Sequence, residues 1–190
     1  TQTRANLGII TTQLVQLLGR KARLLAERDG AETVTFPKGF PTSHEDAPAV
    51  IAGEVKLFRD RRRQRHGQEA QLKERVGQLH QEIEGLTAQR QAKDKELVLI
   101  EDELGRVREL FAKNLLPQTR LLQVERDHAR LIGERGLLTS QIAKAGGQVS
   151  ETELQIIGLD QTLQSESGKE IRELEARVAE LQERRTAAED

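Results

Sequence analysis

The sequence contains no cysteine, tryptophan, tyrosine or methionine, and four phenylalanines make up the 2% of its 190 residues that are aromatic. Without cysteine there is no disulfide, no thiol nucleophile and no thiolate metal ligand. So few aromatic side chains argue against a large globular core, because such cores depend on them. No run of about 18 apolar residues is present, so the sequence predicts no membrane-spanning helix.

The sequence also lacks an excess of either basic or acidic residues. Thirty basic and 31 acidic residues leave a net charge of -1, so no global field draws the chain to nucleic acid or to an anionic membrane. Ala, Glu, Lys, Leu, Arg and Gln dominate, and 32% of the residues are charged. This composition is typical of long helices that bury a narrow apolar stripe, and it predicts an all-α fold.

Apolar residues recur with alternating spacings of three and four, which is the seam of a coiled coil. One such series predicts a helix over 48–113, and a second predicts a helix over 118–190 that slips by one residue around Ser165 to Gly168. The two series are carried by Ile51, Val55, Phe58, Leu72, Val76, Leu79, Ile83, Leu86, Leu97, Ile100, Leu104, Val107 and Phe111, and by Leu121, Leu131, Leu138, Ile142, Val149, Ile156, Leu159, Leu163, Ile171, Leu174, Val178 and Leu181.

The pattern breaks at 114–117, where Asn114 suits the left-handed end of one helix and Pro117 suits the first turn of the next. A connection this short forces the two helices antiparallel. The sequence therefore predicts a long antiparallel coiled-coil hairpin whose tip is residues 114–117.

Folding the chain about residue 116 sets Arg62 opposite Glu170 and Arg65 opposite Glu166. We expect these four residues to form ion pairs within the seam, because a slipped register would bury an arginine against leucine. Lys93 faces apolar residues in this register and has no such partner, so we expect it to extend to the solvent.

The first 28 residues predict an amphipathic helix with a broad apolar stripe, and 29–47 predict a loop rich in glycine, proline and polar residues. A further outward run of about 40 Å would leave this helix without a partner. We expect the loop to double back, so that a shorter third helix packs at the open end of the hairpin in one helical domain.

The search for chemistry finds no catalytic pattern. The four histidines have no partners at metal-ligand spacing, and no glycine-rich phosphate loop is present, so we expect no enzyme activity, no metal and no cofactor. The one strong basic cluster is Arg59-Asp-Arg-Arg-Arg-Gln-Arg65. We interpret it as a solvated face with the two seam pairs, and contact with an adjacent subunit is the alternative.

The tip carries Leu110, Phe111, Leu115 and Leu116, which are more apolar side chains than a two-helix turn can bury. Exposed apolar residues at the end of a long hairpin indicate a docking site for a partner. The alternative is a local plug that closes the coiled coil.

The tip has the form Arg-x3-Leu-x6-hydroxyl except at its last position. Together with Leu110-Phe-Ala-Lys-Asn-Leu-Leu-Pro117, Leu121-Leu-Gln-Val-Glu-Arg126, the opening Thr3-Arg-Ala-Asn-Leu7 and Glu27-Arg-Asp-Gly30, it resembles the HlyD-type periplasmic adaptors, or membrane fusion proteins, of the type I secretion branch. The resemblance implies that Arg106 and Leu110 hold the first two tip positions. Pro117 stands at the third, where efflux adaptors have Ser or Thr, and Thr119 follows two residues later. The predicted partner-docking residues are Arg106, Leu110, Phe111, Leu115, Leu116, Pro117 and Thr119.

The resemblance also implies a function in the Gram-negative envelope. Such an adaptor is periplasmic, is anchored in the inner membrane when full length, and links an inner-membrane ABC transporter to a TolC-like outer-membrane channel as a hexamer. Lipoyl and β-barrel parts would flank this segment, so we expect the chain to be a piece of a longer protein. The rival interpretations are a cytosolic structural coiled-coil arm, a prefoldin-like chaperone hairpin and an RNA-binding helical arm, the last disfavoured by the neutral charge.

Overall fold

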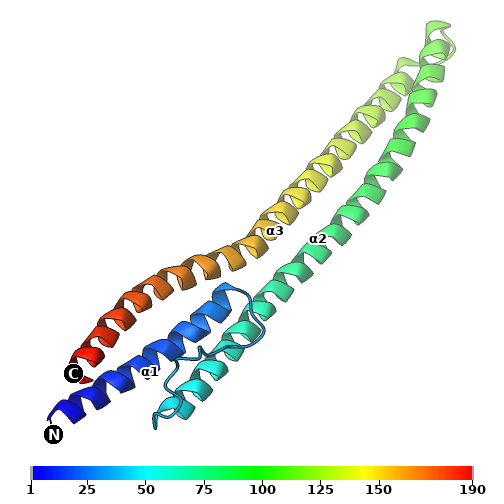
Figure 1. Cartoon of the computed structure of the whole chain (residues 1–190). Helices are drawn as coiled ribbons and strands as arrows, with labels where there is room; N and C mark the ends of the chain where they lie inside the picture. The colour runs from blue at the N-terminus through cyan, green and yellow to red at the C-terminus, as the bar shows by residue number, and fades with distance from the viewer. Residues whose placement is uncertain (1, 190) are drawn as a thin grey trace. The chain divides into compact units, whose positions relative to one another are not determined.

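The computed structural model describes residues 2–189, with side chains for residues 5–188, and in this range it contains three helices and no strand (Figure 1). They are α1 (Gln2–Arg28), α2 (Ala47–Ala112) and α3 (Gln118–Glu189). The predicted fold class is confirmed. The expected first and last positions, residues 1 and 190, lie outside the described residues, and α2 begins and ends one residue earlier than its predicted range of 48–113.

The chain divides into two compact units. The three-helix unit contains the residues up to Gln71 together with those from Ile156 onward, and the tip unit is Leu72–Gln155. The division follows the number of helices: α1 and its loop add a third layer of contacts to the first unit, whereas the second has only α2 and α3.

In the three-helix unit, α1 packs against both other helices through two apolar clusters. Val15 is buried with Phe40 of the returning loop and Ala47 of α2, and Val50 and Ile51 pack against this cluster. A second cluster holds the buried residues Leu24 of α1 and Ile171 and Leu174 of α3, with Leu17 and Leu25 packed against it. The loop therefore doubles back as expected, and α1 lies beside the other two helices.

A buried ion-pair network also joins α1 to α2. Arg23 is 3% exposed and donates from Nε to Glu54 Oε2 at 2.6 Å and from Nη1 to Glu27 Oε1 at 2.8 Å. Arg61 reaches the second oxygen of Glu27 at 3.4 Å. Burial alone would lower the pKa of Arg23, but its bonds to Glu54 and Glu27 outweigh burial and raise the pKa. The guanidinium is therefore held charged between two carboxylates.

The predicted seam ion pairs are wrong, and α1 is the reason. Arg62 donates to the backbone oxygen of Glu32 at 2.8 Å, and Glu170 instead pairs with Arg20 of α1 at 2.8 Å. No ion pair joins Arg65 to Glu166 within residues 5–188. Helix α1 supplies ion-pair partners to the part of α3 for which the sequence pattern alone predicts pairs with α2. Where the seam was predicted to slip, the small side chain of Ser167 is buried.

In the tip unit, α2 and α3 pair antiparallel. Lys93 bonds to Glu134 at 2.9 Å, Asp94 to Arg135 at 3.7 Å, and Glu101 lies 3.4 Å from His128. The midpoints of these pairs fall close to Asn114 rather than residue 116, so the residues that stand opposite one another are shifted by about one turn of helix from the predicted register.

The partner found for Lys93 corrects the expectation that this side chain has none. Its bonds to Glu134 and then Glu96 raise the pKa of Lys93. In turn, bonds from Lys93 and then Arg130 lower the pKa of Glu134. The charged forms of both groups are therefore favoured, and a pair between the two helices stands where the sequence pattern places only apolar neighbours.

Candidate docking surface at the hairpin tip

The turn at the tip is built by one left-handed residue. Asn114 has φ 58°, its N–H donates to the oxygen of Phe111 at 2.9 Å, and the N–H of Leu115 donates to the oxygen of Leu110 at 2.9 Å. This is the Schellman arrangement, which satisfies the last carbonyls of α2. Pro117 then accepts from the N–H of Arg120 at 3.1 Å and opens α3. Backbone geometry thus fixes where the tip side chains point.

An apolar plug lies under the turn. Leu104 and Val107 of α2 and Val124 of α3 are buried together, and Leu116 packs against them. Ile100 and Leu121 also pack against this cluster. Leu116 therefore helps to close the coiled coil, as in the alternative interpretation of the tip.

Other apolar side chains of the tip remain outside the plug. Leu115 is 66% exposed and Leu110 is 39% exposed, while Phe111 is half-buried. Leu122, which the sequence pattern did not single out, is exposed as well. Its place on the helix face next to the seam residue Leu121 is the signal that could have found it. The tip thus combines an internal plug with an exposed apolar rim.

The charged residues of the tip are arranged around this rim. Arg106 is exposed and pairs with Asp102 one turn earlier on α2 at 3.1 Å, and their spacing of four residues is the sequence signal for this pair. Arg108 pairs with Glu125 at 3.2 Å, and Arg120 pairs with Glu103. Pro117 and Thr119 are both exposed. Because the Arg106 pair is exposed and local, it leaves the guanidinium free to exchange partners at little cost.

The seven predicted docking residues therefore share one end of the tip unit but not one role. Arg106, Leu110, Leu115, Pro117 and Thr119 are accessible at the surface. Leu116 packs on the apolar plug under the turn, and Phe111 is half-buried.

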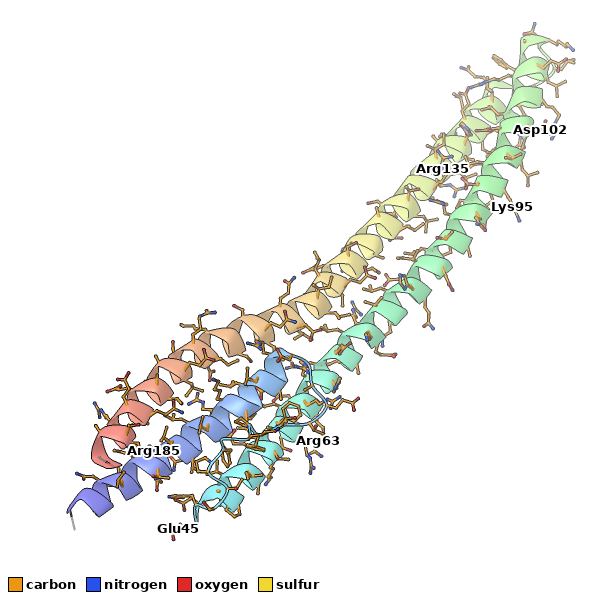
Figure 2. The ribbon with its side chains drawn as sticks, in the orientation of Figure 1. Glu45, Arg63, Lys95, Asp102, Arg135 and Arg185 are labelled. Carbon is orange, nitrogen blue, oxygen red and sulfur yellow. The ribbon has the colours of Figure 1, made fainter. Side chains whose placement is uncertain are left out.

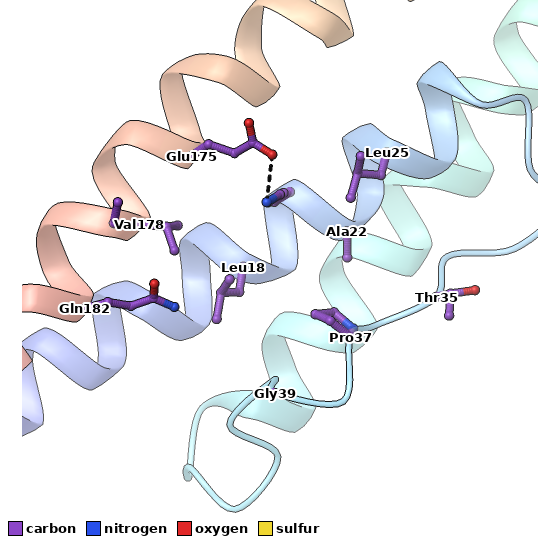
Figure 3. Close-up of a pocket in the computed structure, with 11 residues that line it drawn as sticks. Leu18, Ala22, Leu25, Thr35, Pro37, Gly39, Glu175, Val178 and Gln182 are labelled. Carbon is purple, nitrogen blue, oxygen red and sulfur yellow. Dashed lines mark ion pairs between the residues drawn. The ribbon is translucent and has the colours of Figure 1, made fainter.

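Elsewhere, the structure offers little for chemistry. A groove of the three-helix unit is lined mainly by apolar side chains, among them Leu18, Leu25 and Val178 (Figure 3). Its carboxylate, Glu175, is paired with Lys21 at 2.9 Å. Among the described residues, no group of three or more His, Cys, Asp or Glu side chains could hold a metal ion. Within the same residues, no helix has the length and apolar character needed to cross a membrane.

Two antiparallel helices closed by a capped turn over an apolar plug define a helical hairpin protein. A family model described as "AprE, long alpha-helical hairpin" matches residues 3–190, and the chain belongs to this family. It is also 42% identical over 192 residues to the type I secretion system membrane fusion protein PrsE of Rhizobium meliloti (strain 1021). The predicted resemblance to the helical hairpin of such proteins is confirmed.

The match to PrsE covers 100% of this chain and 44% of PrsE, so the chain spans less than half the length of that relative. Among solved structures, the soluble domain of LipC, a membrane fusion protein of a type I secretion system, matches with a TM-score of 0.93. That match covers 100% of this chain and 90% of the LipC chain at 23% identity, and it supports the fold.

Proposed function

We propose that this chain is the helical hairpin of a periplasmic adaptor in a type I secretion system. In this role it connects an inner-membrane ABC transporter to a TolC-like outer-membrane channel, and the full-length protein is anchored in the inner membrane. The observation that carries the proposal is the 42% identity to PrsE over the whole chain. The uninterrupted helices of 66 and 72 residues suit a protein that reaches across a wide space.

The tip is the surface we propose for contact with the channel. Leu110 and Leu115 offer exposed apolar area that becomes buried when a partner covers it, and Arg106 beside them offers a charged donor. Apolar anchors with an arginine are the groups that dominate binding energy at protein interfaces. Because Leu116 already fills the plug, the rim can be covered without disturbing the turn.

We further propose that copies of the full-length adaptor assemble side by side as a hexamer. Several glycines lie within the continuous helix α3, and a Cβ added to them would meet no atom within 4 Å in this chain. Each costs about 1 kcal/mol of helix stability relative to alanine, so contacts within the chain do not account for them. Close approach of a neighbouring hairpin would account for them. They are Gly133, Gly136, Gly146 and Gly147.

The test is export by cells whose adaptor carries Leu110→Asn together with Arg106→Ala. Loss of a binding anchor worth about 2 kcal/mol lowers channel affinity about 30-fold, so export should fall by at least that order if docking limits it. The matched control is Leu99→Asn, because Leu99 is 70% exposed on the same helix away from the tip. Circular dichroism should show equal helix content in all variants. Export unchanged in the tip variant would contradict the docking assignment.

A further inference from the structure

The arginine-rich run of α2 contains residues that make contacts within the chain and residues that do not. Arg61 reaches Glu27 of α1, and Arg62 donates to the backbone of Glu32. Arg59 and Arg63 line a pocket with Arg62 and Glu32 but, among the described residues, form no bond to another helix, and the side chain of Arg63 is 79% exposed. Figure 2 shows Arg63 on the side of α2 away from α1.

These two arginines belong to a longer basic stripe, which we define as Lys56, Arg59, Arg63 and His66. Spacings of three, four and three residues place the four side chains on one face of α2, and all four are exposed. Among the described side chains, the ion-pair partners of this stripe lie on the same helix: Asp60 at 2.6 Å from Arg63 and Glu69 at 3.8 Å from His66. Such exposed pairs contribute little and exchange readily for a partner on another molecule.

An acidic stripe lies on α3 of the same unit, defined as Glu166 and Glu173. These residues are seven apart, so they share a face, and both are exposed on the side of α3 opposite the buried Ile171 and Leu174. Within residues 5–188, neither takes part in an ion pair. Their carboxylates are therefore not neutralised by a cation of the same chain.

The two stripes stand at matching heights in the three-helix unit. Arg65 and His66 line the same pocket as Leu163 and Gln164, which fixes the level of α2 against α3 there. Because the helices are antiparallel, moving back along α2 corresponds to moving forward along α3. Arg63 is then level with Glu166, and Lys56, seven residues earlier, is level with Glu173, seven residues later.

We propose that the basic stripe of one copy of this chain binds the acidic stripe of a second copy. Within one chain α1 pairs with α3, as the Arg20–Glu170 and Lys21–Glu175 pairs show, and Lys56, Arg63, Glu166 and Glu173 stay exposed. This contact joins two different faces, so it is a head-to-tail contact. Because the two faces lie at the same level along the helices, repeating the contact rotates each copy about an axis parallel to the helices and can close a ring. The proposal rests on the side-by-side assembly proposed above and names the contact that holds the three-helix units together.

This chain contains no cysteine, so cysteines introduced into it test the contact once any cysteine in the rest of the full-length adaptor has been replaced. Full-length adaptors carrying Arg63→Cys and Glu166→Cys on separate copies are expressed together in exporting cells and treated with a short thiol-to-thiol crosslinker. A mixed dimer should form when both copies are present and should be at least tenfold weaker when either copy is expressed alone. The matched control pairs Glu166→Cys with Gln64→Cys, which is one residue along and on another face of α2.

A second set of variants tests charge. Crosslinking between neighbouring three-helix units is here measured from Arg59→Cys on one copy to Glu170→Cys on another. The double change Lys56→Glu with Arg63→Glu, on copies that retain Glu166 and Glu173, should lower this crosslinking several-fold. Adding Glu166→Lys with Glu173→Lys should restore it. If the cells export but no crosslink forms between positions 63 and 166, this contact alone is overturned. If the crosslink forms but the cells do not export, the secretion function alone is overturned.

Discussion

Gly19 is a position where α1 closely approaches α2. An alanine Cβ at Gly19 would lie 2.5 Å from Cγ1 of Val50, 3.6 Å from Cγ of Glu54 and 3.9 Å from Cε2 of Phe40. The shortest of these distances is far inside van der Waals contact. Valine in a helix is held in one rotamer by its branched Cβ, so Val50 cannot turn away without moving the backbone.

The expected effect of Gly19→Ala is the difference between two terms. Overpacking of a close contact costs about 1–3 kcal/mol, and replacing a helical glycine by alanine returns about 1 kcal/mol. The matched control is Gly53→Ala on α2 of the same unit, where an added Cβ meets nothing within 4 Å. The control should stabilise by about 1 kcal/mol, so the two alanines should differ in unfolding free energy by the overpacking term.

Urea unfolding followed by circular dichroism measures both free energies, and hydrogen exchange of the α1 amides localises the change. Gly19→Ala should also speed hydrogen exchange in α1, because the added methyl group strains the contact that holds this helix against α2. If Gly19→Ala and Gly53→Ala stabilise the chain equally, α1 does not pack against α2 at this distance, and the three-helix arrangement is refuted at this contact.

Three further perturbations follow from named contacts. Arg23→Met leaves the Glu27 carboxylate buried without its principal cation and should cost about 3–5 kcal/mol in urea unfolding; a cost below about 1 kcal/mol would mean that the network is solvated. The pKa of Glu134 is lowered by its bond from Lys93, so this pair stabilises the fold at pH values above the ordinary glutamate pKa of 4.5 and is lost as pH falls below that value. The difference in melting temperature between wild type and Glu134→Gln should therefore be constant from neutral pH down to about pH 5 and shrink in more acidic buffer, and a difference that grows there would have the wrong sign. Asn114→Val forces a branched side chain into φ 58° and should destabilise by about 1–2 kcal/mol, whereas Asn114→Gly should be close to neutral, and equal stability of the two variants would argue against the left-handed turn.

The hairpin was predictable because its signals are local. The seam spacing of Leu97, Leu104 and Val107 needs only the helical repeat, and the turn needs only a residue that tolerates positive φ, which Asn114 supplies. The ends of α2 were therefore predicted to within one residue. Periodicity carries this information without any knowledge of what packs on the helix.

The ion pairs were not predictable in the same way, because they depend on a third helix. Placing Arg62 opposite Glu170 treats the seam as two helices, and α1 replaces that pairing with Arg20. The pair of Lys93 with Glu134 was missed for a different reason, since a long flexible side chain reaches past its apolar neighbours to a residue beside the seam.

At the tip, the sequence predicted which residues gather but not which of them are exposed. Leu115 and Leu116 are adjacent and chemically identical, yet one is 66% exposed and the other packs on the plug. Only the direction that the chain takes after Asn114 separates them. Pro117 and Thr119 lie beyond the apolar rim, and their contact with the docking partner stays a prediction.

The central claim is that the tip is the end that meets the outer-membrane channel, and photo-crosslinking from the tip tests it most directly. A photoreactive amino acid replaces Leu115 in one adaptor and Leu99 in another, both of which are exposed positions of the tip unit. In exporting cells, illumination should link position 115 to the channel protein and leave position 99 without that product. Export without a channel adduct at 115, or equal adducts from both positions, would contradict the account.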